Sequence, residues 1–544
     1  MRKRFSLIII ASLAITLFQS EPKFFASVTS AGTITGSVKG PDGAPFMGAF
    51  VIAENSQNKM SVSVLSDKQG HYHFANLPAA TYALRIRAIG YYSEPHTGVQ
   101  LTGDQNAALD FALKNGTVRW SDLSTYQGRM LLPKTREHDL SKGWEDTFFT
   151  SCMTSCHSFQ MRMASTTRDE EGWRERVKYM RDVIMGNQGG GRMMSDAKME
   201  DIVSYLTTAF GPDSPKTKSP ADMPGYKATV RPFSDKVMNI AYAEYNFAGT
   251  KGLGPWSAVE DRDGMMWIPY YGRGNEVVRL NPKTAELTRF PLPFTETAGI
   301  HSVIPDPDGT VWFTEVSFGG IGHLNPATKE ITEYRDKGPD GEIIGKHTVR
   351  VDASGNIWSS GGPISRFDPK TKEFTHFNTP GTYGNVVGRN GDEWFTTYRN
   401  DGPIVRISKT GEVTKWYPPT KGKPQRLQVD SDGTVWFTER VGGKIGHLDP
   451  ESGNIKEFDL PGPSPSPYAI GIDRNHMVWY DSFEQDVLGR LNPTTGEVTE
   501  YPFPHSEISI RELFMDSQGH LWFGSSSNDK VGYFYFQDPV AANK

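Results

Sequence analysis

A tryptophan that recurs at a nearly fixed interval constrains the fold of this 544-residue chain more than any other feature. In the second half of the chain a Trp follows an Asp-x-x-Gly-like turn seven times, at intervals of 36 to 46 residues. The positions are Trp267, Trp312, Trp358, Trp394, Trp436, Trp479 and Trp522. A β-rich repeat of about 40 to 45 residues is typical of β-propeller blades. The interval therefore predicts seven blades.

The residue sequence of the repeat also indicates how the ring closes. The unit Asp-Gly-Thr-Val-Trp-Phe-Thr-Glu occurs at 308–315 and at 432–439, and each copy continues into an Ile-Gly-His-Leu strand. The last unit ends near Phe536 without an outer strand, whereas residues 241–247 form an isolated strand before the first unit. Pairing these two segments would close the ring and leave no open sheet edge. The repeat resembles the streptogramin (virginiamycin B) lyase family of propellers over about residues 240–536, and this resemblance implies the fold more than the activity.

Composition and charge are those of an aromatic-rich globular protein. The chain holds 55 Gly and 36 Pro together with 12 Trp, 21 Tyr and 30 Phe, which favours a turn-rich β structure over disorder. A net charge of −5 gives the chain as a whole no electrostatic attraction to nucleic acid. Only two Cys occur, which excludes a disulfide-scaffolded secreted protein.

The first 31 residues are interpreted as a secretory signal peptide. Arg2, Lys3 and Arg4 precede an apolar run of 14 residues from Phe5 to Phe18, and small residues follow. This run is shorter than the roughly 20 residues that a membrane-spanning helix needs. We therefore expect a periplasmic or secreted protein with no membrane span after signal cleavage.

Residues 32–114 are expected to form a small β-sandwich. Short alternating strands such as 33–38 and 82–88 are separated by turns such as the one at 41–43. These stretches resemble the carboxypeptidase regulatory-like domain. The resemblance implies a non-catalytic module.

Both cysteines lie in the run Cys152-Met-Thr-Ser-Cys156-His157. A c-type haem needs two thiols that form thioethers with its vinyl groups and an adjacent His that ligates the iron. The usual spacing has two residues between the cysteines and this chain has three, a variant that also exists among c-type cytochromes. The run predicts one covalent haem c on Cys152, Cys156 and His157. The alternatives are a local disulfide, a zinc site and a pair of inert thiols.

The flanks of this motif predict a small helical domain. An amphipathic stretch begins at Trp173, and a second helix follows the N-cap residue Ser195 and ends at Gly211. The arrangement resembles a small monohaem cytochrome c domain. In similar domains a Trp followed seven residues later by a Met supplies the axial sulfur, which here implies Met180 as the sixth iron ligand. The other candidates are Met185, Met193 and Met194.

The expected architecture is multidomain and mainly β. An N-terminal β-sandwich and a small α-helical cytochrome c-like domain precede a C-terminal seven-bladed β-propeller. The expected segments are the signal peptide 1–31, the sandwich 32–114, a linker 115–139, the haem domain 140–212, a linker 213–238 and the propeller 239–537.

Position within the repeat predicts a binding site at one mouth of the propeller. The residue eleven positions before each Trp should begin the innermost strand of its blade. These ring residues are Trp256, His301, His347, Tyr383, Gln425, Tyr468 and Arg511. The residues three after the Trp add Tyr270, Glu315 and Glu439 as candidates. Large polar and aromatic side chains at equivalent strand starts predict a ligand-binding ring, in which His is the natural general base near neutral pH.

The candidates divide into two roles. The catalytic candidates are His301, Glu315, His347, Tyr383 and Arg511, and the substrate-binding candidates are Trp256, Tyr270, Gln425, Glu439 and Tyr468. The lyase family opens its substrate's ring by elimination, with a His base and carboxylate-bound magnesium, and His301 followed by Glu315 is similar to that arrangement. The family pattern also has a Glu two residues before this His and a His at the start of the preceding blade, where this chain has Gly299 and Trp256.

Three functions follow from these features. The first is an exported c-type haem protein that transfers electrons and binds or oxidises a small molecule at the propeller mouth, with a redox protein as a further partner. The second is a magnesium-dependent C–O lyase like the family, and the third is a non-catalytic ligand-binding propeller. The fusion of a cytochrome-like segment to a propeller favours the first.

Overall fold

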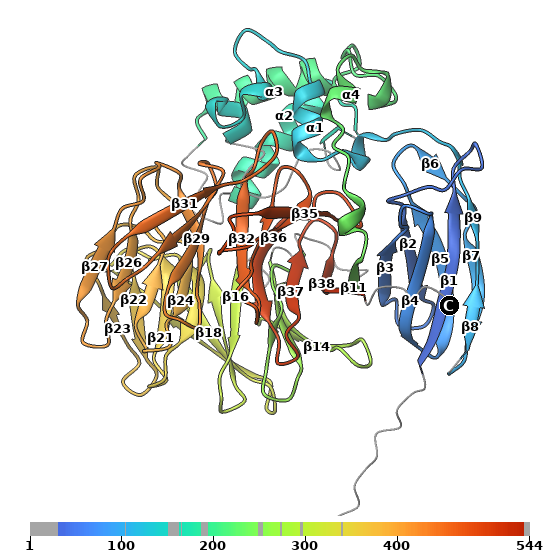
Figure 1. The fold of residues 1–544 in the computed structure, drawn as a ribbon. Helices are drawn as coiled ribbons and strands as arrows, with labels where there is room; N and C mark the ends of the chain where they lie inside the picture. The colour runs from blue at the N-terminus through green and yellow to red at the C-terminus, as the bar shows by residue number, and fades with distance from the viewer. Residues whose placement is uncertain are drawn as a thin grey trace, which may run out of the picture.

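The chain folds into a β-sandwich, a helical layer and a propeller that lie against one another (Figure 1). The computed structural model describes residues 31–103, 105–150, 163–164, 166–185, 194–247, 254–271, 275–293, 298–338 and 341–537. The expected signal peptide, apart from its last residue, and the whole Cys152–His157 motif lie outside the described residues. Within them, no helix is long and apolar enough to cross a bilayer.

The N-terminal part is a sandwich of two sheets, as the alternating pattern predicts. One sheet has the order β4-β1-β8 with β9 also on β1, and the other contains β3-β2-β5-β7. Their inward side chains, including Ile34, Val51, Phe74 and Leu84, form one buried core. The strands are β1 (Ala31–Lys39), β2 (Phe50–Asn55), β3 (Ser61–Leu65), β4 (His71–Pro78), β5 (Ala80–Arg87), β6 (Tyr91–Tyr92), β7 (His96–Leu101), β8 (Asn106–Ala108), β9 (Phe111–Ala112) and β10 (Lys114–Asn115).

The helical layer is larger than predicted. Trp120 and Leu131 lie in the expected linker 115–139, yet both are buried in the same core as Trp173 and Phe210. Short helices thus replace both linkers, because each contributes apolar side chains to this layer. The elements are η1 (Trp120–Asp122), α1 (Thr125–Leu131), η2 (Leu140–Glu145), α2 (Glu170–Tyr179), η5 (Met180–Met185), α3 (Asp196–Phe210), η8 (Pro220–Asp222), α4 (Tyr226–Thr229) and η9 (Asp235–Val237).

The ends of the two longest helices follow the sequence signals. The Asp169 carboxylate accepts the N–H of Gly172 at the start of α2, and the Ser195 hydroxyl accepts the N–H of Lys198 at the start of α3. Such side-chain caps satisfy amide groups that have no partner within the helix. Helix α3 ends at Phe210, directly before the predicted stop at Gly211.

Six four-stranded antiparallel sheets follow one another in the C-terminal part. Each runs in chain order, as expected for propeller blades. The strands are β12 (Val259–Glu260), β13 (Met266–Tyr270), β14 (Glu276–Asn281), β15 (Glu286–Pro291), β16 (Ile300–Pro305), β17 (Val311–Glu315), β18 (Gly320–Asn325), β19 (Glu330–Arg335), β20 (Lys346–Val351), β21 (Ile357–Gly361), β22 (Ser365–Asp368), β23 (Glu373–His376), β24 (Asn385–Val387), β25 (Glu393–Phe395), β26 (Ile404–Ile407), β27 (Val413–Trp416), β28 (Pro424–Val429), β29 (Val435–Glu439), β30 (Lys444–Leu448), β31 (Ile455–Asp459), β32 (Pro467–Ile472), β33 (Val478–Ser482), β34 (Val487–Leu491) and β35 (Val498–Pro502).

The ring closes as predicted. The last sheet contains β36 (Ile510–Met515), β37 (Leu521–Ser525) and β38 (Lys530–Phe536), and its outer strand is β11 (Ile240–Asn246), which pairs antiparallel with β38. The same β11 also pairs with β3 of the sandwich, so one continuous sheet joins the two parts. Both edges of β11 are therefore covered, which protects this strand from pairing with other chains.

The recurring Trp is fixed to the turn that precedes it. In β21 the Trp358 Nε1–H donates to the Asp352 carboxylate at 2.9 Å, and the same carboxylate accepts the Ser354 N–H at 2.8 Å. Four further Trp residues make the equivalent bond to an Asp six positions earlier. His323 stacks on Trp312 and His447 stacks on Trp436, so both His residues contribute to the packing of their blades.

Candidate functional site

The residues predicted from the Trp spacing lie at the start of the first strand of their sheets. His301, His347 and Arg511 are each the second residue of their strand, in β16, β20 and β36. Gln425 and Tyr468 hold this place in β28 and β32, and Tyr383 and Trp256 lie just before β24 and β12. First strands of neighbouring sheets contact one another, so these residues lie around the centre of the ring.

Most of these strands are irregular at the ring residue. In β16 the register shifts between Ile300 and Val303, and β20, β28, β32 and β36 shift at equivalent places. Such a bulge breaks the alternation of a strand and re-aims its side chains. As a result two successive residues of β36 reach side chains of other blades at the centre of the ring: Arg511 lies over Tyr468, and Glu512 pairs with Arg426.

In four of the five bulged strands, the side chain two positions after the Trp accepts the N–H of the residue that follows the ring residue. Thr438 Oγ1 accepts the N–H of Arg426 at 3.0 Å and donates to the carbonyl of Tyr468, in the next blade, at 3.1 Å. Equivalent N–H groups are accepted by Thr314, Ser360, Thr396 and Asp481. Sequence reasoning missed these positioning residues, although the repeated Trp-Phe-Thr-Glu wording contains them.

Four ring residues form a continuous row of aromatic rings that meet in edge and tilted contacts. The ring centroids are 4.4 Å apart for Trp256 and His301, 3.6 Å for His301 and His347, and 4.0 Å for His347 and Tyr383. The hydroxyls of Tyr383 and Tyr468 hydrogen-bond to each other. The structure therefore brings together the His, Tyr and Trp candidates from neighbouring blades.

Three arginines lie beside this row. Together with the other ring residues they form what we call the mouth cluster, which comprises Trp256, His301, His347, Tyr383, Gln425, Arg426, Arg440, Tyr468 and Arg511. Arg426, Arg440 and Arg511 are 4%, 2% and 1% exposed. All three guanidinium groups lie within 6 Å of the Tyr468 ring centroid. The Glu512 carboxylate accepts from Arg426 at 2.9 Å, but it also pairs with Arg350 at 3.0 Å.

The charges of the mouth cluster shift the pKa of its titratable groups. Burial lowers the pKa of His301 and His347 well below the usual value, and nearby guanidinium groups lower both further, so both imidazoles are neutral. Burial opposes ionisation of Tyr468, but Arg511, Arg426 and Arg440 outweigh it and lower the pKa of this phenol. Burial raises the pKa of the neighbouring Asp481 to about 7. The described part of the cluster thus combines three guanidinium groups with neutral imidazoles.

Several buried polar atoms of the mouth cluster have no hydrogen-bond partner within the described residues. They are both ring nitrogens of His301, Gln425 Oε1, Trp256 Nε1 and Arg426 Nη2. An unpaired buried polar group costs about 1–3 kcal/mol, so native proteins leave few of them. Buried polar atoms without partners on neighbouring side chains are a feature that ligand-binding sites share.

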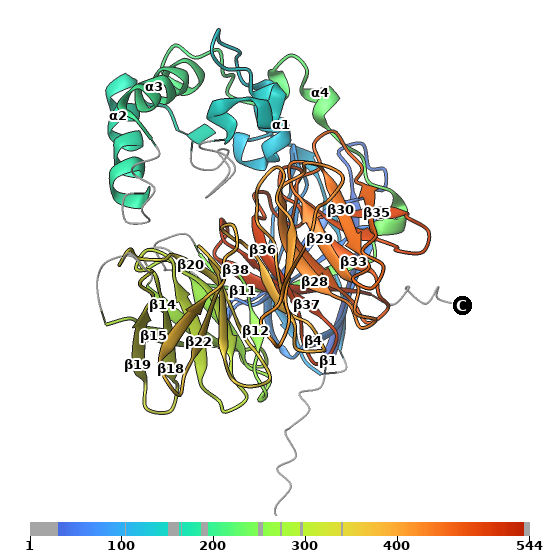
Figure 2. The same cartoon turned by 90° about the vertical axis from the view of Figure 1, so that its left-hand side faces the viewer.

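The helical layer lies over the same end of the propeller, as the two views show (Figures 1 and 2). Trp144 of η2 lies 5.2 Å from the Arg440 guanidinium and 5.7 Å from Lys423 Nζ. Arg129 of α1 pairs with Glu484 at 3.0 Å, and both side chains are buried. The helical layer therefore covers part of the mouth cluster.

The three candidates that follow the Trp do not join the mouth cluster. Glu315 pairs with Arg335 of β19 at 3.3 Å, and Glu439 interacts with Glu457 and Lys444 of the outer strands. Tyr270 donates to Asp529 at 2.7 Å. Successive side chains of a strand point to opposite faces, so Glu315 turns away when Thr314 faces the bulge. The expected pair of His301 and Glu315 is not formed.

The mouth cluster does not fit the magnesium that the lyase resemblance implies. Mg²⁺ prefers carboxylate and water oxygens, and the described part of the chain holds no group of three or more His, Cys, Asp or Glu that would suit a metal ion. The nearest charges to His301 and His347 are the guanidinium groups of Arg426 and Arg511. These would repel a divalent cation.

The predicted haem ligands are described only in part. Cys152, Cys156 and His157 lie outside the described residues, as does Met193, and the side chain of Met185 is not described. Met180 follows α2 directly and is half-buried, whereas Met194 is buried in the helical core. The described flanks of the motif, including Phe149 and Ala164, share that core.

Family models match two parts of the chain. Residues 33–114 match the carboxypeptidase regulatory-like domain, which agrees with the predicted sandwich. Residues 369–542 match the virginiamycin B lyase family. Both matches follow the resemblances predicted from the sequence.

Individual relatives support the propeller. A virginiamycin B lyase of Nocardia farcinica is 28% identical over 217 residues, which cover 40% of this chain and 58% of that protein. The crystal structure of Staphylococcus aureus virginiamycin B lyase has a TM-score of 0.50 and 26% identity, and covers 55% of this chain and all of that one. A catalytically inactive variant of the same enzyme with quinupristin matches with a TM-score of 0.50 and 25% identity over 55% of this chain and all of that one. This chain thus combines a carboxypeptidase regulatory-like domain with a propeller similar to that of virginiamycin B lyase.

Proposed function

We propose that this protein is exported and binds a small anionic, ring-containing ligand at the helical end of a seven-bladed propeller, where a haem c in the helical layer exchanges electrons with the bound ligand. The observation that carries the proposal is the mouth cluster, in which a row of aromatic rings, buried guanidinium groups and unpaired polar atoms meet. Aromatic side chains suit a ring-containing ligand, and guanidinium groups suit a carboxylate or a phosphate.

The charge of the mouth cluster selects the class of ligand. Arg426 shares the Glu512 carboxylate with Arg350, so the carboxylate does not neutralise both. Neutral His301 and His347 offer ring nitrogens as hydrogen-bond partners and not as cations. An anion would neutralise the excess positive charge, and its ring would pair with the aromatic row.

The haem is supported by sequence and by the position of the helical layer. The motif with Cys152, Cys156 and His157 supplies two thioether-forming thiols and an iron ligand, and Met180 is the proposed second axial ligand. The described flanks of the motif belong to the layer that contacts Arg440 through Trp144. Bound haem would supply one-electron chemistry, and the mouth cluster would bind and orient the ligand.

Elimination chemistry is the second candidate, because two of the similar structures are virginiamycin B lyases. The neutral His301 would serve as a base in such a reaction. The cationic surroundings of His301 and the pairing of Glu315 with Arg335 argue against the magnesium-dependent form. We therefore expect no cleavage of a streptogramin B antibiotic, and mass spectrometry of quinupristin incubated with protein and Mg²⁺ tests this expectation.

Ligand binding is tested with matched pairs of probes. Phenyl phosphate and benzoate should raise the melting temperature of the wild type, whereas phenol and benzamide should not, and Arg511→Gln should abolish the shifts. The exposed Arg474→Gln serves as the matched control that retains them. Equal shifts for charged and neutral probes, or shifts that survive Arg511→Gln, would refute the anionic mouth site.

The haem is tested separately. The protein should be exported in a host that matures c-type cytochromes, and its reduced spectrum should be compared with a Cys152→Ala/Cys156→Ala variant. We expect a c-type α band in the wild type alone. A wild-type protein without this band would remove the redox part and leave a ligand-binding propeller.

A further inference from the structure

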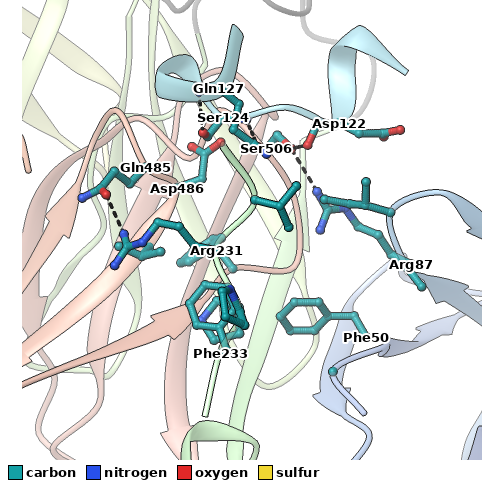
Figure 3. A pocket seen from close by; sticks show the side chains of 18 of the residues that line it. Phe50, Arg87, Asp122, Ser124, Gln127, Arg231, Phe233, Gln485, Asp486 and Ser506 are labelled. Carbon is teal, nitrogen blue, oxygen red and sulfur yellow. Dashed lines mark hydrogen bonds between the residues drawn. The ribbon is translucent and has the colours of Figure 1, made fainter. Parts of the chain in front are cut away.

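A second cavity lies where the sandwich, the helical layer and the propeller meet (Figure 3). Its volume is about 400 Å³, within the range of about 300 to 1,000 Å³ that is typical of small-molecule sites. No residue of the mouth cluster lines it. We call it the junction cavity, and its walls include Phe50 and Arg87 of the sandwich, Asp122 and Phe233 of the helical layer, and Asp486 and Ser506 of the propeller.

One wall of the junction cavity carries a guanidinium group without a direct ion pair. Arg87 Nη2 donates to the Ser506 hydroxyl at 2.9 Å, and no carboxylate of the described residues lies within ion-pair distance of it. The carboxylates of Asp122 and Asp486 favour the charged form of Arg87 from farther away, but their direct contacts are with other groups. Asp122 pairs with Arg119 at 2.7 Å, and Asp486 accepts the N–H groups of Glu507 and Ile508 at 3.0 and 3.1 Å.

The second cation at the junction cavity is already satisfied. Arg231 hydrogen-bonds to Gln485 and to Glu500. Arg87 is therefore the guanidinium at this cavity without a direct carboxylate partner. Phe50 lies beside it on the neighbouring strand β2, and Phe233 lies farther into the cavity (Figure 3).

The remaining wall of the junction cavity is mixed and partly open to solvent, with polar side chains such as Gln127 and Gln485 beside a group of apolar ones. Phe50, Phe233 and Phe503 line its interior. Eleven large hydrophobic side chains are exposed among the described residues, and three of them line this cavity: Met47, Ile89 and Val230. Exposed apolar side chains that gather at a cavity indicate a binding surface.

We propose that the junction cavity binds a small amphipathic monoanion. Its carboxylate or sulfonate head would pair with Arg87, and its apolar body would lie against Phe50, Phe233 and Ile89. All three parts of the chain contribute to the cavity, so a bound ligand would stabilise their arrangement by mass action. This site is independent of the mouth cluster in residues and in ligand shape.

The probe for this site is 8-anilinonaphthalene-1-sulfonate, which is apolar, anionic and fluorescent when bound out of water. We expect saturable binding to the full chain, and Arg87→Met should weaken it about tenfold or more. Decanoate should displace the probe, whereas decanol, which has no charge, should displace it much less. Arg85→Met, on the same strand but exposed and outside the cavity, should bind like the wild type.

A surface variant keeps the proposal testable if Arg87→Met fails to fold. Ile89→Asp places a negative charge at the apolar rim and should also abolish probe binding, while Ile343→Asp, at an exposed Ile outside the cavity, should not. Arg511→Gln should leave this binding unchanged, which separates the junction cavity from the mouth cluster. Wild-type affinity in both Arg87→Met and Ile89→Asp, or equal displacement by decanol and decanoate, would overturn the proposal.

Discussion

Replacing Arg129 by Met should loosen the helical layer from the propeller. Arg129 Nε pairs with Glu484 at 3.0 Å, and its other nitrogens donate to the Ser464 hydroxyl at 2.7 Å and to the carbonyls of Leu140 and Ser141 at 2.9 Å. The Arg129 and Glu484 side chains are 5% and 2% exposed. The variant therefore leaves a buried carboxylate without its cation.

The expected loss of docking free energy follows from the burial of this ion pair. Removing one partner of a buried ion pair costs about 3–5 kcal/mol, because the remaining charge stays buried. At about 1.4 kcal/mol per tenfold change, the undocked state should become roughly a hundred to a few thousand times more populated. Glu484→Gln added to Arg129→Met should recover much of the loss, since it removes the orphaned charge.

Amide hydrogen exchange measures this change directly. The Tyr126 N–H donates to the Glu484 carbonyl at 2.8 Å across the interface, so its protection reports docking. Arg119→Met is the matched control, because Arg119 is 73% exposed in its pair with Asp122 and exposed pairs contribute at most about 1 kcal/mol. If Arg129→Met lost no more protection than Arg119→Met, the helical layer would not be held on the propeller by this pair.

Three further predictions concern the propeller itself. Burial and the charge of Glu457 raise the pKa of Glu439 to about 8, so the folded state keeps a proton that the unfolded state loses near pH 4.5. The stability that this proton confers is lost as the pH rises from 4.5 to 8, at up to about 1.4 kcal/mol per pH unit. Urea unfolding of Glu439→Gln between pH 5 and 8 should therefore show a shallower decline than the wild type or the exposed Glu451→Gln, and an unchanged slope would contradict this pKa. Thr438→Val should weaken the binding of phenyl phosphate, measured at a temperature at which both proteins are folded, because the N–H of Arg426 loses its acceptor in the bulge. Thr438→Ser keeps the hydroxyl and should bind normally. Equal affinities in the two variants would show that the hydroxyl does not position the site. Asp352→Ala should lower the free energy of unfolding by about 1–3 kcal/mol in thermal unfolding, because Trp358 Nε1 and two backbone N–H groups lose their acceptor. Surface substitutions usually change this free energy by less than about 0.5 kcal/mol. A loss below that size would show that the Asp–Trp bond does not stabilise the blade.

Local signals were sufficient to predict the propeller. The Trp interval located the first strand of each sheet. The isolated strand at 241–247 and the missing outer strand of the last unit, which ends near Phe536, indicated the closing pair β11–β38. Both signals depend on the repeated order of strands and turns along the chain, so they can be read from one sequence. The places of His301, His347 and Tyr383 at the centre of the ring follow from the same register.

The charge of the mouth cluster was harder to predict. A regular strand would turn Arg426 away when Gln425 faces the channel, and only the bulge brings both toward the cluster. Arg440 reaches the cluster from the loop after β29, and no periodicity indicates that. The Glu315 prediction failed for the converse reason, because its strand is regular and alternation turns it outward.

The contacts between the three parts of the chain could not be predicted from the sequence either. Arg129 and Glu484 are 355 residues apart, and neither lies in a motif. The pairing of β11 with β3, which joins the propeller to the sandwich, follows from the shape of both surfaces. The segments expected to be linkers turned out to build these contacts.

A redox titration of the haem tests the central claim most directly, because it joins the ligand site to the helical layer in one measurement. We expect the matured wild type to show a c-type α band whose midpoint potential falls when phenyl phosphate binds, since a nearby negative charge stabilises the ferric state. Arg511→Gln should keep the band and lose the shift. A protein without the band, or a potential that phenyl phosphate leaves unchanged, would contradict a haem-linked anion site at the propeller mouth.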